Sequence, residues 1–118
     1  MFLQLAHKEM DVYKIAKSFV LSCYQLSKVF PPEEKFNMVQ QVRRAALSVQ
    51  LNIAEGASRR SLVERRRFYE IARGSVVEID AALDIAISLN YFAKDDIEEL
   101  GDIMTRCFQM LTKMVAYQ

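Results

Sequence analysis

Apolar side chains recur at alternating steps of three and four residues through most of this sequence. Between residues 39 and 53 the stripe is unbroken, with Val39, Val42, Ala46, Val49 and Ile53 in strict succession. This spacing gathers apolar side chains on one face of an α-helix and does not suit a strand, whose side chains alternate between faces. The chain also has only three glycines and two prolines, which is few for a turn-rich β protein. We therefore predict an all-α fold.

Four helical segments follow from the places where the stripes break. The motif FPPEE ends the first, and Gly56 is expected just after the end of the second. Ser61 and Glu64 form a capping box that starts the third, and the stretch LNYFAKDD separates it from the fourth. The predicted helices span residues 4–29, 32–56, 62–89 and 94–116. Short connections favour an antiparallel up-down-up-down four-helix bundle, formed by residues 1–118 as a single domain.

The chain has more apolar side chains than one stripe per helix requires. A small bundle that exposed a second stripe would tend to associate, so we favour a homo-oligomer. The alternative is a thicker core within one chain. The side chains concerned are Met10, Tyr13, Val20 and Tyr24 in the first helix, Tyr69, Val76, Val77, Leu83, Ile85 and Ile87 in the third, and Ile103, Phe108 and Met110 in the fourth.

The cellular address is expected to be the cytoplasm. Charged side chains interrupt every long apolar run, so we expect no membrane-spanning segment and no membrane partner. The first eleven residues lack the basic and apolar regions of a secretory signal. Cys23 and Cys107 fall at apolar helix positions outside any metal or redox motif, and we expect them to be reduced thiols in the core.

Polar and small residues interrupt the apolar faces of the second and third helices. Ser48, Asn52 and Glu55 share one face of the second helix, and a glycine within a helix usually marks the close approach of a neighbour. We therefore expect the second helix to cross the third at its glycine, with shared hydrogen bonds at the crossing. The residues assigned this structural role are Asn52, Glu55, Gly74, Ser75 and Glu78, with Ser61 and Glu64 as the helix cap.

A catalytic interpretation is weaker. Glu55 and Glu78 are the one pair that would serve as an acid–base pair or as metal ligands. A di-iron bundle needs Glu-x-x-His motifs, and the single histidine, His7, lacks that spacing. No nucleophile–base, phosphate-loop or zinc pattern is present in the sequence. We therefore predict a protein that is not an enzyme and that uses no metal and no cofactor.

Charge is strongly segregated along the chain although the net charge is only +1. Residues 41–73 hold eight of the nine arginines against three glutamates, a net charge of +5, whereas residues 74–118 carry a net charge of −5. Five arginines crowd the predicted start of the third helix, where the helix dipole disfavours cations. They are Arg59, Arg60, Arg65, Arg66 and Arg67.

Three explanations for these arginines stay open. A nucleic-acid backbone would satisfy them, because guanidinium groups bind phosphate and release counterions. Carboxylates of another subunit or of a protein partner would do so by ion pairing in a head-to-tail ring. A solvated surface with local ion pairs is the third. We favour RNA or DNA, bound largely without sequence preference because few aromatic side chains lie among the arginines. The candidate nucleic-acid-binding residues are Arg43, Arg44, Arg59, Arg60, Arg66 and Arg67.

Longer motifs carry a resemblance to a known family. They are NIAEG at the end of the second helix, an R-x-S-x-x-E turn ending at Glu64, and FYEIARGSVVE in the third helix, together with FPPEEKF. In these motifs the chain closely resembles the bacterial 23S rRNA intervening-sequence protein family over nearly its whole length. The residues that fall on the family signature are Asn52, Glu55, Gly56, Ser61, Glu64, Phe68, Gly74, Ser75 and Glu78.

The resemblance implies a four-helix bundle that assembles as a ring, usually a homopentamer, and it supplies no catalytic residues. It also implies a relative, the accessory protein of diversity-generating retroelements, which is a basic pentameric bundle that binds nucleic acid and a reverse transcriptase. The present chain departs from that relative because it is nearly neutral and has an acidic fourth helix.

Overall fold

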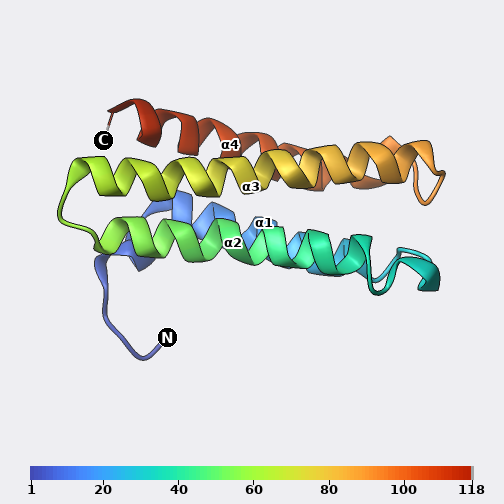
Figure 1. The fold of residues 1–118 in the computed structure, drawn as a ribbon, viewed down its shortest axis with the longest axis horizontal. Helices are drawn as coiled ribbons and strands as arrows, with labels where there is room; N and C mark the ends of the chain where they lie inside the picture. The colour runs from blue at the N-terminus through green and yellow to red at the C-terminus, as the bar shows by residue number, and fades with distance from the viewer. Residues whose placement is uncertain (118) are drawn as a thin grey trace.

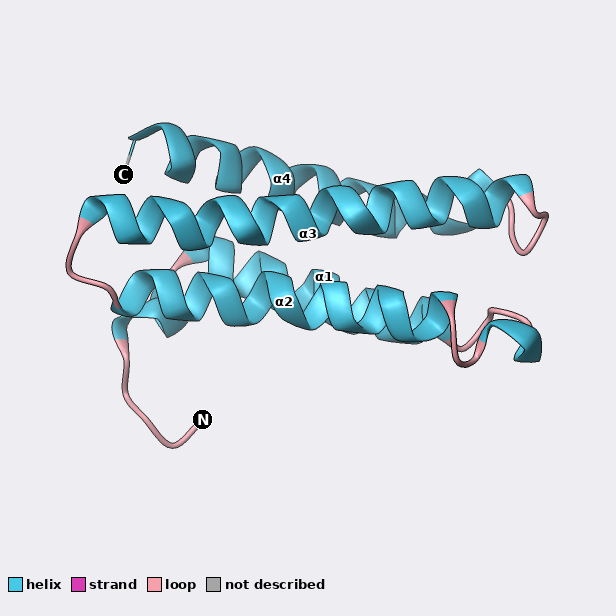
Figure 2. Cartoon of the chain, viewed as in Figure 1, coloured by secondary structure: helices cyan, strands magenta, loops and turns pink. Residues whose placement is uncertain are grey.

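The computed structural model describes residues 1–117, which form four α-helices and no β-strand (Figure 2). Short 3₁₀ helices precede the first, second and fourth of them. The α-helices are α1 (Asp11–Ser27), α2 (Met38–Ser58), α3 (Leu62–Ser88) and α4 (Glu98–Tyr117), and the 3₁₀ helices are η1 (Ala6–Glu9), η2 (Pro32–Glu34) and η3 (Lys94–Ile97).

The four α-helices run side by side along the long axis of a body of 44 × 30 × 21 Å (Figure 1). Successive helices point in opposite directions, and α4 packs on both α3 and α1, which closes the bundle. The α2–α3 connection lies at one end, together with the start of α1 and the end of α4. The other two connections lie at the opposite end. The predicted antiparallel four-helix arrangement is therefore confirmed.

The apolar stripes form the core, as the heptad spacing predicts. Every residue of the stripe from Val39 to Ile53 is buried, and Phe19, Ile79 and Leu111 supply large, fully buried side chains from the other helices. In so short a chain this burial is the main stabilising contribution, because single helices of this length are marginal in water.

Three helices begin later than the sequence predicts. α4 starts at Glu98 and not at residue 94, because residues 94–97 form the 3₁₀ helix η3. α1 starts at Asp11 and not at residue 4, and residues 1–5 are exposed. Glu9 occupies the stripe position there, and no residue of η1 is buried. α2 starts at Met38 and not at residue 32, because Asn37 leaves the helical region (φ −129°, ψ −95°) and its side chain donates to Glu34.

The second apolar stripes divide between core and surface. Tyr69, Val76, Leu83 and Val20 are buried within the bundle, so a thicker core explains these four. Val77, Ile85 and Phe108 remain exposed.

Within residues 1–117, no helix has both the length and the hydropathy needed to cross a bilayer.

Candidate functional site

The short connection between α2 and α3 gathers the five clustered arginines into what we call the arginine corner: Arg59, Arg60, Arg65, Arg66 and Arg67. α2 ends at Ser58 and α3 begins at Leu62. The hydroxyl of Ser61 accepts a hydrogen bond from the backbone N–H of Glu64 at 3.3 Å, which is the predicted N-terminal cap. The cap fixes the direction in which α3, and the arginines of its first turns, leave the connection.

Two arginines of the corner are held by contacts within the chain. Arg59 forms an ion pair with Glu55 at 3.3 Å, and its guanidinium lies 5.0 Å from the centre of the Phe68 ring. Arg65 donates from Nε to the backbone carbonyl of Arg59 at 2.6 Å. These contacts place both guanidinium groups beside the C-terminal end of α2. Cations are favoured at that end of a helix, which offsets their unfavourable position at the start of α3.

The other corner arginines face solvent. Arg60, Arg66 and Arg67 are exposed, and Arg60 and Arg67 form no ion pair with any residue that the structure describes. Two apolar side chains are exposed beside them, Leu62 at 54% and Val63 at 75% of their full area. This outward part of the corner therefore combines positive charge with a small apolar surface.

Arg43 and Arg44 lie elsewhere. They are in the first turns of α2, about 24 Å along the helix axis from Arg59 at 1.5 Å per residue. Arg43 donates to the hydroxyl of Ser27 at 2.8 Å and lies 5.2 Å from the centre of the Tyr24 ring. Arg44 is exposed. The six candidate residues are thus divided between the two ends of α2.

The polar residues of α2 and α3 form a smaller network than the sequence predicts. The hydroxyl of Ser75 donates to that of Ser48 at 2.8 Å, and the Asn52 amide donates to the same Ser48 oxygen at 3.0 Å. Glu55 instead accepts from Ser58 at 3.1 Å and pairs with Arg59, while Glu78 is exposed. The expectation that Glu55 and Glu78 join this network is therefore wrong.

The close approach of α2 and α3 occurs at a different glycine. Gly74 is exposed, and a Cβ atom placed on it would meet no atom within 4 Å. Gly56 is buried inside α2, where a Cβ atom would lie 2.8 Å from Cε1 of Tyr69. The predictions that Gly74 marks the crossing and that Gly56 follows the end of the helix are both wrong.

Both cysteines lie in the core and not at the surface. Cys23 and Cys107 are free thiols with no exposed area. Burial raises the pKa of each thiol to about 12, so both stay protonated and unreactive in the folded chain. Among residues 1–117, no group of three or more His, Cys, Asp or Glu side chains is placed to hold a metal ion.

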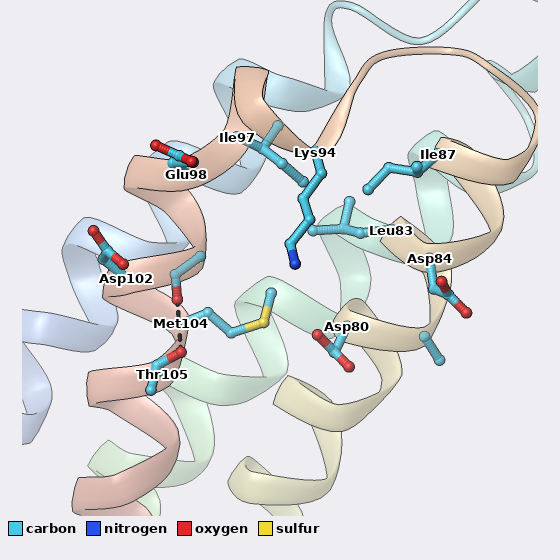
Figure 3. A pocket seen from close by; sticks show the side chains of 12 residues that line it. Asp80, Leu83, Asp84, Ile87, Lys94, Ile97, Glu98, Asp102, Met104 and Thr105 are labelled. Atoms are coloured by element: carbon cyan, nitrogen blue, oxygen red, sulfur yellow. Dashed lines mark hydrogen bonds between the residues drawn. The ribbon is translucent and has the colours of Figure 1, made fainter.

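A second surface, which sequence reasoning missed, is a groove of about 930 Å³ between α3 and α4 (Figure 3). Asp80 and Asp84 border it on α3, and Glu98 and Asp102 border it on α4. We call it the acidic groove. The sequence shows these acidic residues only as separate charges, because their meeting depends on how α4 packs on α3.

Comparison with known proteins agrees with this bundle. The family model described as 23S rRNA-intervening sequence protein matches residues 8–113. The chain belongs to this family. No match was found among curated proteins. The kinship with the retroelement accessory protein stays a prediction.

A crystal structure of a protein of unknown function from Bacteroides thetaiotaomicron, assigned to the S23 ribosomal protein family, is similar to this family member. The two share 23% sequence identity with a TM-score of 0.80, over 88% of this chain and 97% of the other. At this level of identity the likeness supports the shared fold.

Proposed function

We propose that this member of the 23S rRNA-intervening sequence protein family is a non-catalytic, homo-oligomeric scaffold. It binds RNA or DNA at the arginine corner in the cytoplasm, largely without sequence preference, and the family resemblance favours a ring of five chains. The observation that carries the proposal is that Arg60 and Arg67 are exposed on one corner and form no ion pair with any residue that the structure describes.

The chemistry of the corner fits a phosphate backbone. A guanidinium group can donate two hydrogen bonds to the oxygens of one phosphate. Its binding also releases counterions from the nucleic acid, which favours association at low salt. The backbone N–H groups at the start of α3 add positive potential at the same place. The phosphate backbone of a nucleic acid can bind these guanidinium and backbone N–H groups at the same time.

Sequence preference is expected to be weak. Reading a base by stacking requires an accessible aromatic side chain. Phe68, the aromatic ring beside the corner, is covered by the guanidinium of Arg59 at 5.0 Å. Binding therefore depends on the backbone of the nucleic acid and not on its bases.

A non-catalytic role fits the positions of the one pair of carboxylates that the sequence suggested. Glu55 is held by Ser58 and Arg59 at the end of α2, and Glu78 faces solvent on α3. They share no hydrogen bond, and neither is desolvated as an acid–base catalyst would need to be.

The test is fluorescence anisotropy with a labelled, mixed-sequence, single-stranded RNA at about 50 mM salt. The variant Arg60→Ala/Arg66→Ala/Arg67→Ala should weaken binding at least about tenfold, since each lost phosphate contact removes released counterions. The matched control, Lys28→Ala/Lys35→Ala/Arg106→Ala, removes three exposed cations outside the corner and should bind nearly as the wild type. Equal affinity of the two triple variants for the RNA would reject the proposal.

The single variant Arg44→Ala, measured in the same assay, tests whether the exposed candidate at the other end of α2 contributes to RNA affinity.

A second candidate function is a protein–protein assembly module in which the corner arginines pair with carboxylates of a neighbouring subunit or a partner protein. One observation favours it. The acidic groove carries four carboxylates and a single ammonium group, that of Lys94, so it has the charge opposite to the corner.

A further inference from the structure

The acidic groove has an apolar floor between charged edges. Leu83 and Met104 form buried parts of its lining, and Asp80, Asp84 and Asp102 stand exposed at its edges (Figure 3). A smaller hollow of about 270 Å³, which shares Asp80 and Met104, extends it toward the middle of the bundle. There Val77 and Phe108 expose 52% and 38% of their area.

The apolar floor and the charged edges together indicate which side chains of a partner would bind in the acidic groove. An apolar floor favours an apolar side chain, and the carboxylate edges favour cations on either side of it. Lys94 supplies one cation against four carboxylates, so the groove keeps a net negative charge. A helix turn that carries apolar residues flanked by arginines would meet both requirements.

The start of α3 is such a turn. Val63 is exposed at 75%, and Arg66 and Arg67 follow it by three and four residues, so they flank it one turn further along the helix. Arg60 precedes it in the α2–α3 connection. The arginine corner therefore presents an apolar side chain between cations, which complements the acidic groove.

One chain cannot bring these two surfaces together. Val63 and Asp84 both lie on α3, about 30 Å apart along a straight helix at 1.5 Å per residue. No side chain spans that distance. The opposite charges therefore meet only if two copies of the chain associate.

We propose that the arginine corner of one copy docks into the acidic groove of a second copy. The inference rests on the homo-oligomeric part of the proposed function and names its interface. RNA and the acidic groove then compete for Arg60 and Arg67, so RNA binds at corners that are not docked. The contact is heterologous, because each copy contributes one corner and one groove. Repetition of such a contact gives a closed ring where the rotation between copies closes, and an open filament where it does not.

Charge reversal on each surface tests the proposal. The corner variant is Arg60→Glu/Arg67→Glu, and the groove variant is Asp80→Lys/Asp84→Lys; all four positions are exposed, and circular dichroism checks that both variants fold. In light scattering each variant alone should have the mass of one chain, 13.6 kDa, where the wild type is an oligomer. Loss of the paired charges should weaken association more than about thirtyfold.

Mixing the two variants gives the decisive result. The corner variant keeps an intact groove, and the groove variant keeps an intact corner. The intact corner can therefore dock into the intact groove, and the carboxylate corner of the first variant can dock into the lysine groove of the second. We expect the mixture to assemble to a mass of two chains or more, with the two variants alternating, although each variant alone stays at the mass of one chain. The chain with all four substitutions should regain the wild-type oligomer, since its carboxylate corner meets a lysine groove.

The proposal is overturned if the wild type is a monomer, if the groove variant keeps the wild-type mass, or if the mixture does not associate. RNA affinity separates this failure from failure of the proposed function. The groove variant keeps its arginines and should bind RNA at least as tightly as the wild type. An oligomer that is insensitive to groove reversal, combined with RNA binding that depends on the corner, would reject this interface and leave nucleic-acid binding standing.

Discussion

The hydroxyl of Tyr91 donates a hydrogen bond to Glu34 Oε2 at 2.6 Å, and this bond joins the α3–α4 connection to η2 in the α1–α2 connection. The other oxygen of Glu34 accepts from the Asn37 side chain at 3.1 Å and from the Met38 backbone at 3.4 Å. One carboxylate thus ties together the two connections at the end of the bundle opposite the arginine corner.

This arrangement predicts a specific dependence of stability on pH. The bond from Tyr91 lowers the pKa of the Glu34 carboxyl below its ordinary value of 4.5, against the opposing effect of burial. The carboxylate therefore stabilises the folded chain above pH 4.5, and this contribution is lost as the pH falls below that value. Urea unfolding at several pH values should show a smaller loss below pH 4.5 in Tyr91→Phe than in the wild type. Identical pH profiles would contradict this role of Tyr91.

Two glycines should respond to alanine with opposite signs. In Gly56→Ala the new methyl group would lie 2.8 Å from Cε1 of the buried Tyr69 ring, so we expect a loss of about 1 to 2 kcal/mol in unfolding free energy. Gly74→Ala is the matched control. Its methyl group meets no atom within 4 Å, and alanine's higher helix propensity should raise stability by up to about 1 kcal/mol. Denaturant unfolding of both variants checks the prediction, which fails if their effects have the same sign.

The two cysteines should report opening of the core. Burial raises the pKa of Cys23 and Cys107 from 9.0 to about 12, so the protonated thiols contribute stability that is complete below pH 9.0 and is lost as the pH rises toward 12. At pH 8 a thiol-reactive dye should modify the folded chain at least about a hundredfold more slowly than the urea-unfolded chain. Rapid labelling of the folded chain would place at least one thiol outside the core.

The sequence predicts the helices well because the apolar stripes extend over their full length. It fails at the starts of α1, α2 and α4, where 3₁₀ helices precede the α-helices and local hydrogen bonds, such as that from Asn37 to Glu34, influence the backbone. The sequence does contain a pattern that places Gly56 inside α2 and facing the core. This glycine follows Val49 and Ile53 by seven and three residues, and so continues the buried stripe of α2.

The candidate site is less predictable because it depends on which helix ends meet. The helix dipole of α3 alone makes all five arginines of the corner unfavourable. The structure brings the C-terminal end of α2 to the same corner, where it accommodates Arg59 and Arg65. The acidic groove likewise depends on the packing of α4 against α3, which the stripe pattern does not specify.

The most direct test of the account is the salt dependence of RNA binding. The logarithm of the association constant for single-stranded RNA, plotted against the logarithm of salt concentration, has a slope of about −0.7 for each phosphate contact. Between about 50 and 200 mM salt, Arg60→Ala/Arg66→Ala/Arg67→Ala should make this slope shallower by about 2 relative to the wild type. The control Lys28→Ala/Lys35→Ala/Arg106→Ala should leave it unchanged. An unchanged slope in the corner variant would contradict the account, because the exposed arginines would then contact no phosphate.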